Sequence, residues 1–249
     1  MNRIVLSVGL IAAVAAWGPA RGAADELADV EKLVAEKNKE IRSARFKIKT
    51  VTEMVTEGFE SRGQSEGHVE YVLKDGKWYS RAESKDRSEQ KMGDQSNKME
   101  GTSLSVCDGE FIWMMSDMNG QKSVTKSRAT SDPIIVENPI GMMREQHNVK
   151  LLPEESVDGA ACHVIEATPK DQGELAGRMV QYFRKADGFT VKVVSFSPDG
   201  KPMMTMNCTD IELNPKIDPS RFKFEPPAGV QVMDLTQQSA EPQSEPEQP

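Results

Sequence analysis

Two periods of apolar residues organise the chain. Between residues 27 and 41 apolar residues recur at helical spacing among Glu and Lys. They are Leu27, Val30, Leu33, Val34 and Ile41. This spacing predicts one amphipathic helix. Between Phe46 and Lys49 the apolar period falls to two residues, which predicts the start of a strand.

The dipeptide Asp-Gly then punctuates the chain, between runs rich in β-forming residues. It occurs at Asp75-Gly76, Asp108-Gly109, Asp158-Gly159, Asp187-Gly188 and Asp199-Gly200. Asp-Gly supplies the positive φ values of tight hairpin turns. The strands predicted around these turns are Gly67–Leu73, Lys77–Ala82, Thr102–Cys107, Glu110–Met115, Lys150–Glu155, Ala161–Ala167, Gly177–Lys185, Phe189–Ser197 and Pro202–Leu213. Consecutive hairpins predict an antiparallel meander and not a βαβ fold.

Two stretches interrupt this pattern. Ser131 to Gln146 is too apolar for an exposed loop, so we expect a short broken helix there. Glu83 to Gly101 is almost entirely polar, so we expect a mobile loop or a protruding hairpin. A twisted sheet of about ten strands does not stay flat. The expected fold is therefore mainly β, a curved antiparallel meander forming an unclosed half-barrel, covered by the N-terminal helix and a short broken helical lid.

The first residues predict export. Arg3 precedes an apolar run from Ile4 to Trp17, with small residues behind it, which is typical of a secretory signal peptide cleaved before Ala23 or Asp25. The run is shorter than the roughly 20 residues that span a bilayer, although an uncleaved anchor stays an alternative. We expect a signal peptide at 1–24, one domain at 25–235, and a periplasmic location. The Gln-, Ser-, Glu- and Pro-rich end, 236–249, is expected to be a disordered tail.

Charge and cysteine content narrow the partners. Of 249 residues, 31 are basic and 39 acidic. The only charged residues in the signal peptide are basic, so its removal would make the net charge more negative. Nucleic acid is therefore not an expected partner. The three cysteines, Cys107, Cys162 and Cys208, lack the close spacing of metal or redox motifs. They allow one disulfide with a spare thiol, or three free thiols.

The sequence offers little for catalysis. The three histidines, His68, His147 and His163, lie in no nucleophile-elbow or papain-like context. The chain contains no zinc-protease, Walker or dinucleotide motif. We therefore expect no catalytic residue, no metal site and no cofactor, while a triad assembled only in space keeps an enzyme as an alternative.

Methionine is the unusual chemical resource. Met114, Met115 and Met118 form one cluster, Met142 and Met143 a second, and Met203, Met204 and Met206 a third. Thioethers select Cu(I), but they also fill irregular cores and line sites that accept several ligand shapes. If the methionines line a ligand site, the residues expected to line its apolar cavity are Trp78, Leu104, Val106, Trp113, Met115, Ile134, Ile140, Met142, Met143, Phe183 and Met204. The inward face of each strand stays open, because a one-residue register shift reverses it.

Two motifs resemble a known family. The run Ile217–Asp234 contains RFKFEPPAGVQV, which resembles the closing "(K/R)F-x-F-x-PP-x-GV-x-V" stretch of LolA-type periplasmic lipoprotein carriers. Ser105–Trp113 resembles that family's "VSDG-x-x-x-W" hairpin, and the helix followed by Phe46–Thr50 is similar to its opening helix and first long strand. The chain thus resembles a divergent member of the lipoprotein-sorting superfamily.

The resemblance implies an unclosed β-barrel with helices as a lid over a cavity for acyl chains. It implies a monomeric lipid-binding carrier that moves lipoproteins, or another acyl-bearing molecule, from an inner-membrane releasing transporter toward an outer-membrane acceptor. One position departs from the family, because Lys74-Asp75-Gly76 stands where the carriers have an Arg-Pro pair that moves the lid, and an ammonium does not reproduce a guanidinium fork. The alternative is an RseB-like envelope-stress sensor, which resembles the same half-barrel but binds a membrane protein.

Overall fold

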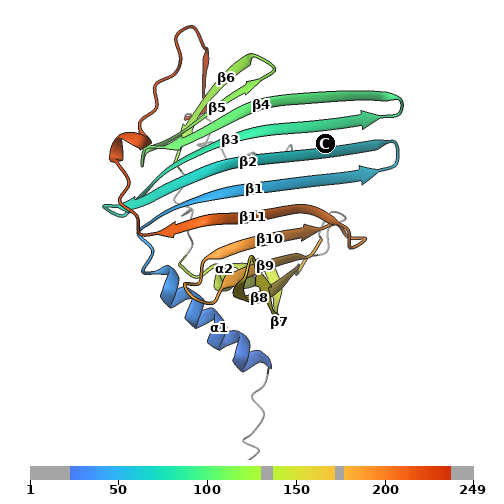
Figure 1. Cartoon of the computed structure of the whole chain (residues 1–249), viewed down its shortest axis with the longest axis vertical. Coiled ribbons are helices and arrows are strands. Elements are labelled where there is room, and N and C mark those ends of the chain that lie inside the picture. Colours follow the sequence, from blue (N-terminus) through green and yellow to red (C-terminus); the bar gives the residue numbers. More distant parts are fainter. Residues whose placement is uncertain (1–22, 130–136, 172–176, 237–249) are drawn as a thin grey trace, which may run out of the picture.

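One sheet of 12 strands dominates the molecule (Figure 1). The computed structural model describes residues 23–129, 137–171 and 177–236. The first group of elements is α1 (Ala23–Asn38), β1 (Ser43–Thr56), β2 (Phe59–Lys74), β3 (Lys77–Met92), β4 (Gln95–Cys107), β5 (Phe111–Met118) and β6 (Gln121–Arg128). The second group is α2 (Pro139–Gln146), β7 (His147–Val157), β8 (Ala160–Pro169), β9 (Met179–Arg184), β10 (Thr190–Phe196), β11 (Pro202–Leu213), the 3-10 helix η1 (Pro219–Phe222) and β12 (Val232–Asp234).

The sheet consists of two meanders joined along β1 and β11. Its strand order is β12-β6-β5-β4-β3-β2-β1-β11-β10-β9-β8-β7, and every pair is antiparallel except β12 with β6. The outer strands β12 and β7 do not pair with each other, so the sheet is not closed into a barrel. The structure confirms the mainly β, unclosed architecture and the meander predicted from the sequence.

The Asp-Gly dipeptides lie where the pattern predicts turns. All five are between consecutive strands of the two meanders. At Asp75 and Gly76 both φ values are positive, 52° and 74°, and at Asp158 and Gly159 they are 49° and 81°. Two consecutive residues with positive φ match the twist of the flanking strands, which is why Asn or Asp followed by Gly favours two-residue hairpins.

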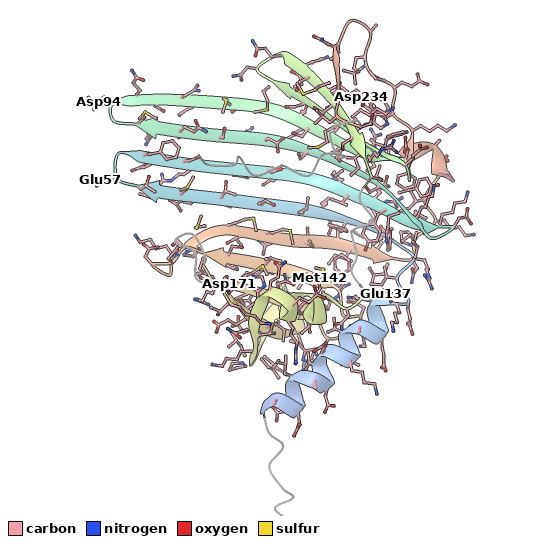
Figure 2. The ribbon with its side chains drawn as sticks, turned by 180° about the vertical axis from the view of Figure 1, so that it is seen from behind. Glu57, Asp94, Glu137, Met142, Asp171 and Asp234 are labelled. Atoms are coloured by element: carbon pink, nitrogen blue, oxygen red, sulfur yellow. The ribbon has the colours of Figure 1, made fainter. Side chains whose placement is uncertain are left out.

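The polar stretch from Glu83 to Gly101 forms a hairpin, one of the two structures expected for it. It consists of the ends of β3 and β4, with Gly93 at φ 57° in the turn. It does not stand alone, because the β1–β2 hairpin pairs alongside it over the same length. Figure 2 shows Glu57 and Asp94 at the two neighbouring hairpin tips.

Several sequence predictions fall outside the described residues. They include the signal peptide up to residue 22, the tail from residue 237, and Ile134 with the rest of 130–136. The remaining part of the apolar segment forms α2, as the broken-helix prediction requires. None of the described helices is long and apolar enough to cross a membrane.

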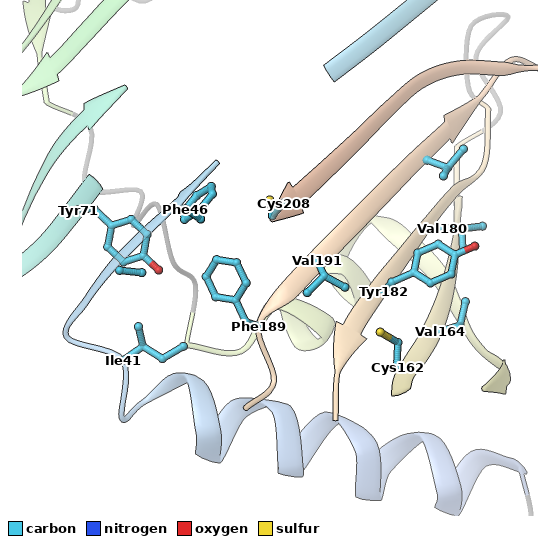
Figure 3. Packing of buried hydrophobic residues seen from close by; sticks show 12 residues of the cluster. Ile41, Phe46, Tyr71, Cys162, Val164, Val180, Tyr182, Phe189, Val191 and Cys208 are labelled. Carbon is cyan, nitrogen blue, oxygen red and sulfur yellow. The ribbon is translucent and has the colours of Figure 1, made fainter. Parts of the chain in front are cut away.

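Two buried clusters hold the molecule together. In the first, Phe46 packs edge-on against Tyr71, at a ring-centre distance of 6.2 Å, and against Phe189 at 5.4 Å. Figure 3 shows these rings grouped together. The second cluster joins both helices to β8 and β9, and it consists of Leu27, Val30, Val34, Ile140, Met143, Ile165, Ala167 and Phe183. The helices are thereby packed onto one face of the sheet.

Polar contacts fix the two helices to each other. Arg144 Nε lies 2.9 Å from a carboxylate oxygen of Glu31 on α1, and Asn138 Nδ2 donates to the same carboxylate at 3.1 Å. Asn138 also caps α2 by accepting a hydrogen bond from the Gly141 amide. In the last turn of α1, Lys37 Nζ donates to the carbonyl of Lys185 at 2.6 Å. The helices therefore form one unit over the sheet.

Candidate functional site: an apolar cavity on a neutral sheet face

Strand register assigns every strand residue to one of two faces, since side chains alternate. Paired positions such as Phe46 with Val69, and Ile48 with Cys208, share a face. Phe183 lies on the same face of β9 and packs with the helical residues of the second cluster. We call this the helix face and the reverse side the opposite face.

A cavity of about 440 Å³ lies between the helix face and α2. Its floor comes from three adjacent strands that meet at the seam of the two meanders, with Phe46, Ile48, Val69, Tyr71, Met206 and Cys208. Its remaining walls are Asn38, Pro139, Met142, Met143, Gln181, Phe189, Thr190 and Val193. A mainly apolar cavity with a few polar side chains is typical of a small-molecule site.

Tyr71 is the most unusual group in the cavity wall. The residue is fully buried, and its hydroxyl has no hydrogen-bond partner in the described structure. Burial raises the pKa of Tyr71 well above its usual value, so the hydroxyl stays protonated. Burial likewise raises the pKa of the neighbouring Cys208 thiol to about 11, so this sulfur is a small apolar surface and not a thiolate.

Beyond the cavity the helix face of β1 to β4 carries a single charged residue, Asp86, and many small residues. The small residues on it include Gly63, Ser65, Gly67, Ser80, Ala82, Ser84, Ser88, Gly101, Ser103 and Ser105. Methionines lie among and beside them, and those that register assigns to this face on β1 to β5 and β11 are Met54, Met92, Met99, Met114, Met118, Met204 and Met206. Small side chains let a ligand approach the backbone closely, and methionine adapts to its shape.

The opposite face of the same strands is covered with charges of both signs. Lys49 Nζ lies 2.6 Å from Glu66, and Arg62 Nε lies 3.0 Å from Glu53. A larger hollow of about 750 Å³ lies here, but basic and acidic side chains alternate along its lining and pair with one another. We favour the smaller, apolar cavity as the binding site, because the ion pairs of the larger hollow are exposed to water.

The C-terminal segment covers the other part of the opposite face. Phe222 is buried against Tyr79 at a ring-centre distance of 6.0 Å, and Phe224 packs on Trp113 at 5.5 Å. Arg221 Nε lies 2.9 Å from the carboxylate of Glu70. The RFKF part of the closing signature is therefore a strap across the sheet, on the side away from α2.

The structure brings some of the predicted lining residues together. Met142 and Met143 line the cavity from α2. Trp78 packs edge-on against Tyr71 at 5.5 Å, and Met204 shares the face of Met206. Ile140 and Phe183 belong to the buried cluster beneath the helices and are core residues.

The other predicted lining residues lie elsewhere. Leu104, Val106, Trp113 and Met115 are on the opposite face, since the register pairs Val106 with Trp113 and Leu104 with Met115, one residue out of phase with the helix face. Trp113 contacts the C-terminal strap instead of the cavity. Ile134 lies outside the described residues.

Sequence reasoning missed most of the cavity floor. Phe46, Val69 and Tyr71 stand on strands whose alternate residues are charged, and this alternation identifies their face as the neutral one. Phe189 and Cys208 come from the second meander, and only the pairing of β1 with β11 brings them near Phe46.

Lys74 is the last residue of β2, directly before the tight turn at Asp75 and Gly76. It pairs with Lys77, is exposed, and belongs to the opposite face, where it borders a separate hollow of about 500 Å³ with Tyr79 and Phe222. In this chain the position that matches the carriers' lid arginine therefore faces away from α2.

Two of the three histidines lie close to a polar group. His147 Nδ1 lies 3.2 Å from the carbonyl of Met143, and His163 lies 3.9 Å from Glu154. Burial, with a smaller effect of Lys185, lowers the pKa of His163. Within residues 23–129, 137–171 and 177–236, no group of three His, Cys, Asp or Glu side chains is placed to hold a metal ion.

The three cysteines are all buried and unbridged. Burial raises the pKa of the Cys107 and Cys162 thiols, as it does for Cys208. Protonated, enclosed thiols are poor nucleophiles and weak metal ligands.

Comparisons with known proteins give the following similarities. A family model described only as an uncharacterized protein matches residues 136–225. An uncharacterized protein of Methanocaldococcus jannaschii is 30% identical over 135 residues, which are 52% of this chain and 37% of that protein. The chain thus spans little more than a third of this relative.

Solved structures show a similar arrangement at low identity. LprF from Mycobacterium bovis has a TM-score of 0.47 at 11% identity, covering 78% of this chain and 97% of LprF. MucB of the Pseudomonas aeruginosa MucA/MucB complex has a TM-score of 0.45 at 12% identity, covering 80% of this chain and 61% of the matched chain. The chain spans less than two thirds of that MucB structure.

Proposed function

We propose that this protein binds an acyl-bearing molecule, a lipid or a lipoprotein, with the acyl chain in the cavity between α2 and the helix face. The observation that carries the proposal is an apolar cavity whose floor continues, by strand register, into a largely uncharged sheet face with several methionines. The same strands place their charges on the reverse side. The proposed activity is binding without catalysis.

The energetics favour a long apolar ligand. Each buried methylene contributes about 0.8 kcal/mol, so a chain of a dozen carbons stabilises its complex considerably. Met142 has 52% of its surface exposed although it lines the cavity, and it offers an apolar contact at the entrance. A flexible thioether at an entrance accommodates chains of different shapes.

The finer role in this proposal is that of a carrier in the cell envelope. It would receive an acylated molecule at the inner membrane and deliver it toward the outer membrane. The helical unit of α1 and α2 supports this role, because it can shield an acyl chain from water during transfer.

The direct test is uptake of a fluorescent acyl probe by the purified protein. We expect saturable binding, which Met142→Asp weakens at least about tenfold, because a carboxylate at the entrance is poorly solvated against the chain. Met233→Asp on β12 is the matched control, since Met233 is similarly exposed, at 62%, and lies away from the cavity. Absence of probe binding, or an equal effect of both changes, would contradict the proposed site.

A further inference from the structure

Asp86 on β3 is the one charged residue that register places on the helix face of β1 to β6 among the described strands. Its neighbours in sequence, Lys85 and Arg87, point to the opposite face because side chains alternate. A carboxylate on an otherwise neutral surface is energetically costly unless something compensates it. Its surroundings therefore need an explanation.

Three serine hydroxyls hold the carboxylate in place. Ser65 on β2 donates to Oδ1 at 2.6 Å, and Ser103 on β4 donates to Oδ2 at 2.5 Å. Ser84, on the same strand as Asp86, lies 3.0 Å from Oδ1 and 3.2 Å from Oδ2. Three neighbouring strands thus contribute to one fixed anionic group.

These hydroxyls orient the charge but do not neutralise it. Each serine oxygen that donates to Asp86 keeps lone pairs that accept hydrogen bonds. The carboxylate and its three serines consequently present several acceptors and one negative charge to the helix face. An ammonium group, with three donors and one positive charge, complements this arrangement.

The distance to the cavity sets the size of the ligand. Asp86 pairs with Ser65, Ser65 with Thr50, and Thr50 with Met206 in the cavity floor. Three strand spacings separate Asp86 from Met206, or about 14 Å. The surface between them is neutral, so one extended amphiphile can reach both places.

We propose that Asp86 and its three serines bind the cationic headgroup of the acyl-bearing ligand, a primary ammonium such as an amine-bearing lipid carries. This inference rests on the proposed function, because it places the ligand's chain in the cavity between α2 and the helix face. It adds the class of headgroup that the protein selects.

The test compares three probes with the same 12-carbon chain, namely dodecylamine, dodecanol and dodecanoate. Their affinities are measured by displacement of the fluorescent acyl probe. We expect the wild-type protein to bind the amine roughly tenfold more tightly than the alcohol, as a charge-assisted hydrogen bond contributes. Dodecanoate, with its negative charge, is expected to bind most weakly.

Asp86→Asn removes the charge and keeps acceptor and shape, so it should abolish the preference for the amine and leave dodecanol binding unchanged. Asp117→Asn is the matched control, because Asp117 lies on the opposite face beside Lys122 and should leave the preference intact. A salt titration of the wild-type protein tests the same charge without any substitution. Added salt should reduce the amine preference of the wild-type protein without affecting dodecanol.

The outcomes separate the two proposals. If no 12-carbon probe binds, the proposed function fails. If all bind but the wild-type protein does not distinguish amine from alcohol, or if the preference survives Asp86→Asn, the headgroup inference is overturned while the acyl cavity stands. A network that only cross-links strands would change the unfolding midpoint in the Asn variant without changing selectivity.

Discussion

The two faces of strands β1 to β4 are made by the same backbone yet differ in almost every property. On the opposite face, residues such as Lys49, Glu66 and Arg62 form exposed ion pairs. On the helix face the positions in between are uncharged, mostly small, apolar or methionine residues, with Asp86 as the single charge. Exposed ion pairs contribute little to stability, so the charged face is chiefly a surface for water.

This difference shows what the polar stretches of the sequence encode. A strand with two wet faces needs no such separation of charged from uncharged residues. Here the separation extends over four long strands, from the cavity to the hairpin tips. The helix face is accordingly suited to contact something less polar than water, and each experiment below changes one face and compares it with the other.

The largest effect is expected from a charge placed beneath the helices. Ile140 is fully buried in the cluster that joins α2 to the sheet. Ile140→Asp should destabilise the protein by on the order of 4 kcal/mol, because it buries an unpaired carboxylate and removes packing. Urea unfolding measures this loss.

The control is Met142→Asp on the same helix. Since Met142 is half exposed, its substitution should change the free energy of unfolding by less than about 1 kcal/mol while affecting ligand binding. Equal losses of stability for the two variants would contradict the placement of Ile140 toward the sheet and of Met142 toward solvent.

A smaller effect is expected on the opposite face, at Glu70. Its side chain is 10% exposed and lies 2.8 Å from Arg45 and 2.9 Å from Arg221. Burial raises the pKa of this carboxyl, but hydrogen bonds from Arg221 and Arg45 outweigh it and hold the pKa below its usual value. Glu70→Gln should cost about 1 to 2 kcal/mol at neutral pH, less than for a fully buried pair because both arginines are partly exposed.

The pH dependence follows from the direction of that shift. A lowered folded-state pKa stabilises the protein above the unfolded value, about 4.3, and this contribution is lost as the pH falls through the folded value. The difference between wild type and Glu70→Gln should therefore shrink below about pH 4.5. Glu66→Gln, in an exposed pair, should give a weaker effect, and a difference that persists at pH 2.5 would contradict the ion-pair origin.

The smallest effect returns to the helix face, at Tyr71. Its buried hydroxyl lacks a partner, so Tyr71→Phe should leave stability unchanged or raise it by roughly 1 kcal/mol. Thermal unfolding, compared with Tyr79→Phe on the opposite face, measures the change. A clear loss of stability in the Phe variant would mean that an unseen partner, such as a bound water, satisfies the hydroxyl.

Much of the sheet was predictable because its signals are local. Asp-Gly turns fixed five hairpin positions, and the predicted strand Pro202–Leu213 coincides with β11. The length of β3 and β4 was not evident, because Glu83 to Gly101 lacks the apolar residues that mark a half-buried strand. There, alternation between charged and small residues was the signal, and it looks like a loop when polarity alone is considered.

The cavity was less predictable because it depends on register and on long-range pairing. Leu104 and Trp113 alternate as lining residues would, but on the opposite face, where Leu104 borders the charged hollow and Trp113 packs against Phe224 of the C-terminal strap. Alternation separates two faces without saying which one carries the helices. Ile140 lies in the apolar segment that was expected to form the lid, but only its packing in the second cluster shows that it is a core residue.

The seam between β1 and β11 has a consequence for the order of assembly. Phe46 enters the cavity floor from the beginning of the domain and Cys208 from near its end, and the strands that carry them are direct neighbours. A chain still lacking its last fifty residues has the first meander but lacks β11, so β1 has no partner on that side and its free edge and apolar face stay open to association with other chains. The binding site is thus among the last parts to form during synthesis. Until then the nascent protein needs protection from aggregation, as we propose it later protects its ligand.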